Sequence, residues 1–192
     1  MSSAPRPGVL FDRDGVINVP PPPEKRYVTT PDEFHLMPGI AGAVALLNQW
    51  GIPVGVVTNQ KCVAIGRVTL PMLERIHIRM RDLLAEAGAH VDTIQFCPHS
   101  EKDHCTCRKP LPGMLFQAAD SLNLDLTASW LIGDQARDIE AGHAAGCHTL
   151  RVGPQADGSA GEEVFLSNTL DLAVWIREKS GFGKKESCQG MG

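Results

Sequence analysis

The chain has 192 residues, of which 43% are hydrophobic and 21% are charged, a composition typical of one domain with a single core. A formal net charge of -4 without a basic stripe argues against nucleic acid as a partner. No apolar run is long enough to cross a membrane, and the first residues lack the hydrophobic segment of a signal peptide. We therefore expect a cytoplasmic protein whose six cysteines are kept reduced, and we expect it to be a monomer.

The first informative stretch is a short apolar segment, Val9–Phe11, that is followed by Asp12, Asp14 and Gly15. A hydrophobic strand that ends in Asp-x-Asp-Gly places its first carboxylate at the carboxyl end of a sheet, where open α/β folds bind ligands. Two carboxylates so close repel each other unless a cation or a proton lies between them. The pattern favours a hard cation or a carboxyl group that acts as an acid, with a solvated turn as the alternative.

The following segments alternate between helix and strand. Residues 40–49 predict a helix, and residues 53–57, which are apolar and β-branched, predict a buried parallel strand. This strand leads into Thr58–Gln60, polar residues placed where an anion could bind. Apolar residues at helical spacing predict a longer helix that ends at Gly88, and residues 93–96 predict another strand.

A metal-binding pattern follows that strand, with three cysteines and two histidines between residues 97 and 107. Thiolate and imidazole groups bind Zn²⁺ tetrahedrally, so this segment predicts a zinc site formed by Cys97, Cys105, Cys107 and either His99 or His104. Three reduced cysteines without a metal are the alternative. Four protein ligands leave no open coordination position, so the zinc would be structural and would fix the cations Arg108 and Lys109 that come next.

The second half of the chain continues the alternation. The expected elements are a helix at 114–122, a strand at 129–132 that ends in the acidic turn 133–138, a strand at 149–152 and a helix at 170–178. Strands alternating with helices predict an α/β fold with a doubly wound parallel sheet. We expect a single domain over residues 1–192, with its core at about 8–178 and a frayed C-terminal tail at 180–192.

Taken in chain order, these residues resemble the four motifs of the haloacid dehalogenase (HAD) superfamily of phosphatases. The resemblance spans about Val9 to Val152, and the matching positions are Asp12 with Asp14, Thr58, Lys109, and Asp134 with Asp138. It implies a HAD-like Rossmannoid fold. The intervals between the motifs leave no room for a separate cap domain, so the active site should be open.

The resemblance also implies a reaction through an aspartyl-phosphate, with Asp12 as the nucleophile and Asp14 as the general acid and base. Asp14 must then be protonated when the substrate binds. Asp12, Asp134 and the main-chain carbonyl of Asp14 would bind Mg²⁺. Thr58 would donate a hydrogen bond to a phosphoryl oxygen, and Lys109 would supply a positive charge.

Asp138 has two possible roles. It orients Lys109 or a metal-bound water, or it is the N-cap of a helix that begins at Ile139.

The order Cys-x-His and then Cys-x-Cys resembles the zinc loop of one HAD branch, which contains histidinol phosphatases and D,D-heptose 1,7-bisphosphate phosphatases. This likeness selects His99 as the fourth zinc ligand and implies that Arg108, with Asn59 and Gln60, binds the substrate. In the heptose enzymes the residue after the last motif's first Asp is often Lys, whereas here it is Gln135, one cation fewer.

The expected substrate is therefore a small phosphorylated metabolite. D-glycero-D-manno-heptose 1,7-bisphosphate, losing its 7-phosphate, ranks first. Histidinol phosphate or another small phosphomonoester ranks second. A non-catalytic zinc-loop interaction module is the alternative from another class.

Overall fold

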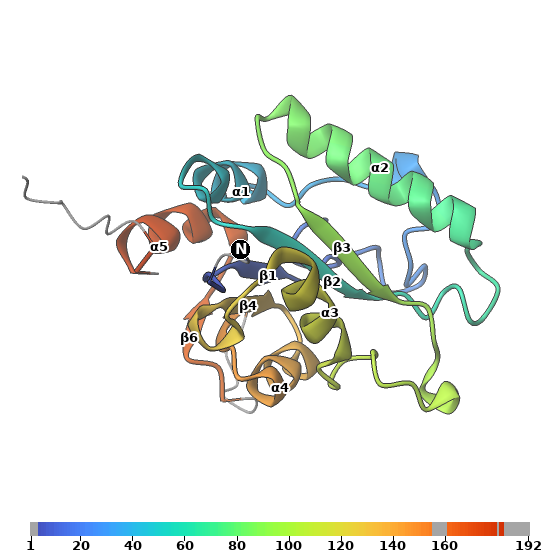
Figure 1. Cartoon of the computed structure of the whole chain (residues 1–192). Helices are drawn as coiled ribbons and strands as arrows, with labels where there is room; N and C mark the ends of the chain where they lie inside the picture. The colour runs from blue at the N-terminus through green and yellow to red at the C-terminus, as the bar shows by residue number, and fades with distance from the viewer. Residues whose placement is uncertain (1–3, 155–160, 180, 183–192) are drawn as a thin grey trace, which may run out of the picture.

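A six-stranded parallel sheet forms the centre of the computed structural model, which describes residues 4–154, 161–179 and 181–182 (Figure 1). The strand order is β3-β2-β1-β4-β5-β6. The strands are β1 (Val9–Phe11), β2 (Val54–Asn59), β3 (Thr93–Cys97), β4 (Trp130–Gly133), β5 (His148–Val152) and β6 (Val164–Leu166). The order reverses between β1 and β4, and such a reversal opens a crevice at the carboxyl ends of the two strands.

Helices cover both faces of this sheet (Figure 1). One face is covered by α1 (Ile40–Gln49), α2 (Leu70–Glu86) and α5 (Leu172–Glu178), and the other by α3 (Gly113–Leu122) and α4 (Ala136–Ala145). Successive side chains of β1 alternate between them, because Val9 and Phe11 pack in the first core and Leu10 packs in the second. All three are fully buried, as expected for a central parallel strand.

The predicted α/β fold with a parallel sheet and a loop with the zinc-binding pattern is confirmed, and the described residues form no separate cap. Two elements near the end of the chain differ from their predictions. The helix expected from residue 170 divides into a 3-10 turn at Thr169–Asp171 and α5, and the short edge strand β6 was not predicted. Three half-buried residues are too few to show the alternation that marks a strand. Most of the predicted tail, residues 180 and 183–192, lies outside the described residues.

Within the described ranges, no helix is both long and apolar enough to span a membrane.

Candidate active site

The predicted motif residues converge where β1, β2 and β4 end. Asp12 directly follows β1, and its main-chain N–H donates a 2.8 Å hydrogen bond to the carbonyl of Ile132 in β4. Thr58 lies in β2 and Asp134 directly follows β4. Lys109 reaches the same point from the loop between β3 and α3. Parallel strands thus bring together residues far apart in sequence, as the motif order predicted.

Lys109 is the centre of a buried ionic cluster. Its Nζ atom lies 2.7 Å from Oδ1 of Asp12 and 2.7 Å from Oδ1 of Asp138, and it donates a 2.7 Å hydrogen bond to the carbonyl of Val57. Burial lowers the pKa of Lys109, but the two carboxylates outweigh this effect and raise the pKa above its ordinary value. The ammonium group therefore stays charged beside the predicted nucleophile.

Asp138 both orients Lys109 and caps a helix, the two roles that the sequence left open. The helix, however, starts earlier than predicted, so Asp138 is not its N-cap residue. Helix α4 begins at Ala136, not at Ile139, and Gln135 is its N-cap. Asp138 is the third helical residue, where its Oδ2 accepts a 3.0 Å hydrogen bond from the main-chain N–H of Gln135 in a capping box. Its other oxygen pairs with Lys109. One carboxylate therefore closes the helix end and orients the lysine.

Asp12, Asp134 and Asp138 form a cluster suited to a hard cation. One carboxylate oxygen from each lies within 4.8 Å of the others. Burial raises the pKa of Asp12 to about 7, with the neighbouring carboxylates adding to the rise and Lys109 opposing it. Burial also raises the pKa of Asp134 to about 6, and the Oδ1 atom of Asp134 is buried without a hydrogen-bond partner. Three carboxylates beside a single lysine leave an excess of negative charge, which fits Mg²⁺ with its preference for oxygen ligands.

The loop after β1 approaches this cluster closely because it contains a glycine. Gly15 has φ +97°, and a Cβ atom there would lie 2.4 Å from Oδ2 of Asp134. Any other residue would clash with the Asp134 carboxylate.

The carboxylate of Asp14 is held by a set of donors. Both of its oxygens accept 2.9 Å hydrogen bonds from Nη2 of Arg13, and Nε2 of Gln60 and Nδ2 of Asn18 donate at 2.9 and 3.1 Å. Burial raises the pKa of Asp14, but the charge and hydrogen bonds of Arg13, with those of Gln60 and Asn18, lower it below its ordinary value. Asp14 is thus ionised here, and proton donation requires this ion pair to rearrange.

Arg13 is a residue that the sequence analysis missed. Its side chain is fully buried, its Nη1 lies 3.4 Å from Nε2 of His77, and its guanidinium lies 6.0 Å from the ring centre of Phe34. Burial, together with Arg13, lowers the pKa of His77 to about 3, so this imidazole is neutral and able to accept a hydrogen bond from Arg13. The available signal was a histidine on the apolar face of the predicted long helix.

The polar residues at the end of β2 mainly support other site residues. Oδ1 of Asn59 accepts a 3.1 Å hydrogen bond from the N–H of Lys109, and its Nδ2 donates a 3.0 Å bond to the carbonyl of Lys109. Nε2 of Gln60 donates a 2.8 Å hydrogen bond to Oγ1 of Thr58 and a 2.9 Å hydrogen bond to Oδ2 of Asp14. The side-chain amides predicted to bind substrate are therefore engaged by protein atoms in this structure.

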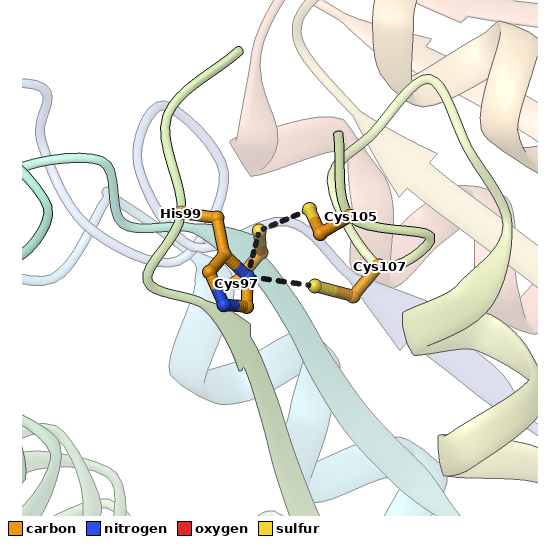
Figure 2. Close-up of side chains that lie close together, drawn as sticks. All are labelled: Cys97, His99, Cys105 and Cys107. Carbon is orange, nitrogen blue, oxygen red and sulfur yellow. Dashed lines mark hydrogen bonds between the residues drawn. The ribbon is translucent and has the colours of Figure 1, made fainter. Parts of the chain in front are cut away.

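The four sulfur and nitrogen groups of the predicted zinc site lie together between β3 and α3 (Figure 2). Sγ of Cys97 is 3.6 Å from Sγ of Cys105 and 3.6 Å from Nδ1 of His99, and this nitrogen is 3.3 Å from Sγ of Cys107. A tetrahedron with bonds of about 2.0–2.3 Å has edges of roughly 3.3–3.8 Å, so the spacing fits zinc. His104, the alternative ligand, is not among this group.

The sheet also connects this cluster to the lysine. Cys97 is the last residue of β3 and pairs with Asn59 of β2 in the sheet. The main-chain N–H of Gln60 donates a 2.7 Å hydrogen bond to the carbonyl of Cys97. Asn59 in turn holds both main-chain polar groups of Lys109.

Arg108 lies beside a cleft of about 390 Å³ that Lys109 also lines. Its Nη2 donates a 2.7 Å hydrogen bond to Oε1 of Glu101, and its Nη1 donates 3.3 Å to the carbonyl of His99. The guanidinium is therefore oriented by the cysteine-containing loop that precedes it.

A parallel sheet with a lysine and three carboxylates at its carboxyl edge is the architecture of a HAD-like phosphatase, and the HAD-hydrolase-like family matches residues 106–161. A D-glycero-β-D-manno-heptose-1,7-bisphosphate 7-phosphatase from Pseudomonas aeruginosa is 42% identical over 75% of this chain and 79% of its own length. The enzyme of the same name from Pseudomonas putida is 40% identical, and the match covers 88% of this chain and 97% of the other. The chain belongs to this family of HAD-like phosphatases.

A solved structure agrees with this assignment. The crystal structure of D,D-heptose 1,7-bisphosphate phosphatase from B. bronchiseptica, complexed with magnesium and phosphate, matches this chain with a TM-score of 0.77. The two sequences are 33% identical, and the match covers 88% of this chain and 97% of the other. The predicted phosphoric monoester hydrolase is thereby confirmed.

Proposed function

We propose that this phosphatase removes the 7-phosphate of D-glycero-β-D-manno-heptose 1,7-bisphosphate. The observation that supports the chemistry is the juxtaposition of Asp12, Lys109 and Asp134 at the switch point of the sheet. The likeness to relatives named for this substrate, over most of the chain, supports the choice of sugar. A small phosphorylated metabolite is also consistent with a site that has no separate cap.

The proposed reaction has two steps. A carboxylate oxygen of Asp12 attacks phosphorus, the bond between phosphorus and the sugar oxygen breaks, and Asp14 gives its proton to the departing oxygen. Water then attacks the aspartyl-phosphate and transfers a proton to Asp14, which releases inorganic phosphate and restores Asp12. Thr58 donates a hydrogen bond to a phosphoryl oxygen in both steps, and Lys109 balances the developing negative charge.

Magnesium fits the donor set described above. Asp12, Asp134 and the main-chain carbonyl of Asp14 would hold it, with Asp138 nearby. When bound, it supplies charge neutralisation for the phosphoryl oxygens. Cys97, His99, Cys105 and Cys107 would hold a structural zinc ion that fixes the position of Arg108 and Lys109.

Arg108 is proposed to bind the phosphate that is not hydrolysed, because a guanidinium suits bidentate hydrogen bonding to phosphate. Asn59 and Gln60 act at the substrate end of β2 by holding Lys109, Thr58 and Asp14 in place. We also propose that the enzyme is a cytoplasmic monomer and that its chain forms a single domain.

The experiment is a comparison of substrates with purified protein and Mg²⁺. Phosphate release from the heptose bisphosphate, histidinol phosphate and an aryl phosphate is measured, and the sugar product is analysed for the position of its remaining phosphate. The proposal expects the highest kcat/KM for the bisphosphate and a product that keeps its 1-phosphate. A higher kcat/KM for histidinol phosphate would replace this substrate with the second candidate, and no hydrolysis by a correctly folded protein would exclude both.

A further inference from the structure

The cleft beside Lys109 contains a second arginine, Arg137, that the proposed chemistry does not use. The cleft lies between the cysteine-containing loop and the first turn of α4, where Arg137 is the second helical residue. Arg108 and His104 line the same cleft from the loop side. Cationic groups from two separate elements therefore face one space.

Arg137 differs from the other cations because its guanidinium makes no direct polar contact. Lys109 is paired with two carboxylates, and Arg108 is paired with Glu101. Across residues 4–154, 161–179 and 181–182, the structure shows no hydrogen bond or ion pair to Arg137, which is exposed. Its positive charge is near enough to the carboxylate cluster to lower the pKa of Asp134. A guanidinium that is exposed beside a cleft can bind an anion without first breaking a protein contact.

Its neighbour Gln135 does not provide a cation to this cleft. Nε2 of Gln135 donates a 2.8 Å hydrogen bond to Oδ2 of Asp134, and its side chain lines a different cleft, bordered by Gly15 and Arg151. Among the described residues of α4 and of the turn that precedes it, Arg137 is the one that lines the Arg108 cleft, and it places a positive charge there.

We propose that Arg137 is a specificity-determining residue that binds, together with Arg108, the substrate phosphate that is not hydrolysed. This inference rests on the proposed function and adds a residue to it. Two guanidinium groups that line one cleft from different elements suit a phosphate dianion, and the positive end of the α4 dipole adds to the attraction. Lys109 links the cleft to Asp12, so one phosphate can lie at the nucleophile while the other lies between the arginines.

The test compares two substrates in each variant. The kcat/KM for the heptose 1,7-bisphosphate is divided by the kcat/KM for the heptose 7-phosphate, which lacks the second phosphate. In Arg137→Gln this ratio should fall about tenfold or more, mainly through the KM of the bisphosphate, as expected for the loss of a charge-assisted contact. Arg137→Lys should keep part of the ratio, and Arg75→Gln, an exposed position on α2, serves as the matched control.

Three results would overturn the inference. A ratio in Arg137→Gln within twofold of wild type would show that Arg137 does not select the second phosphate. An equal loss on both substrates would place Arg137 at the scissile phosphate instead. If the wild-type enzyme itself gave a ratio near one, it would not prefer the bisphosphate, and both the proposed substrate and the role of Arg137 would be rejected. A normal wild-type ratio with no change in Arg137→Gln would reject the role of Arg137 alone.

Discussion

At the scale of single residues, the contact between Asp12 and the buried ammonium of Lys109 leads to the first prediction. Asp12→Asn should abolish turnover, because an amide does not form the acyl-phosphate that the mechanism requires. Steady-state phosphate release from an aryl phosphate with Mg²⁺ measures this, and circular dichroism confirms that the variant is folded. Turnover near the wild-type rate in Asp12→Asn would reject the aspartyl-phosphate mechanism.

The second prediction concerns the general acid. Asp14→Asn keeps the main-chain carbonyl proposed to bind Mg²⁺ but removes the proton donor, so kcat should fall at least ~100-fold. The loss should shrink for substrates with good leaving groups, since these depart without protonation. Rates for sugar phosphate and nitrophenyl phosphate in the same variant make the comparison. Equal losses on both would indicate that Asp14 positions the site and does not transfer a proton.

The residues proposed to carry this chemistry were easier to predict from sequence than those that support them. Asp12, Lys109 and Asp134 each occupy a recognisable motif at the end of a strand or in a loop. The contact between Arg13 and His77 joins the loop after β1 to a helix 64 residues away, so it has no local pattern. For Asp138, a helix start was predicted from its residue type but at the wrong position, whereas its contact with the distant Lys109 was expected from the family resemblance and has no local sequence pattern.

At the scale of elements, the cysteine-containing loop shows how a local sequence pattern sets the position of distant chemistry. The spacing of cysteines and histidine was readable from sequence because all four groups lie within eleven residues. The choice of His99 over His104 depended on resemblance. In the structure, His104 lies at a left-handed position, φ 45°, outside the cluster that contains His99.

The third prediction tests this loop. Purified protein should contain one zinc ion per chain, and Cys107→Ser should lose the zinc and unfold at lower temperature, because binding energy from four ligands is folding energy. Each kcal/mol lost should lower Tm by about 2–4 °C for a chain of this size. His104→Asn, which keeps a residue that tolerates the left-handed conformation, is the control and should retain its metal. Zinc content measured by atomic absorption, together with thermal melts, distinguishes the two variants.

At the scale of the whole molecule, the parallel sheet and its helical layers were predictable because strands and helices alternate with strong hydrophobic patterns. The strand order does not follow from these local patterns, since it depends on crossovers between segments far apart in the chain. The start of α4 was misplaced by three residues because its N-cap is Gln135, a residue type that seldom marks a helix start.

The fourth prediction links stability to pH. The pKa of Asp12 is about 7 in the folded protein, above its ordinary value of 3.8, so the folded state binds this proton more tightly than the unfolded state. Without Mg²⁺, its contribution to the free energy of unfolding is fully present below pH 3.8 and is lost as pH rises through about 7. The Tm of Asp12→Asn minus that of wild type should therefore increase between pH 5 and pH 8, by about 2 °C or more.

Magnesium should reverse this trend, because it binds the deprotonated carboxylates. The gain in Tm on adding Mg²⁺ should be larger at pH 8 than at pH 5 in wild type, and it should be reduced at both pH values in Asp134→Asn. Differential scanning fluorimetry across this range provides the measurement. A gain that is independent of pH would contradict a metal site formed by Asp12 and Asp134.

The register of β2 and β3 has a consequence for how the enzyme responds to oxidants and chelators. Cys97 lies beside Asn59 in the sheet and Asn59 grips the main chain of Lys109, while Cys107 precedes Lys109 by two residues in the chain. Oxidation of Cys97 would thus shift Lys109 through the sheet and Asn59, and oxidation of Cys107 would shift it through the loop. Loss of either thiol should then disable a molecule, so the remaining activity should follow the fraction of chains in which both thiols are reduced.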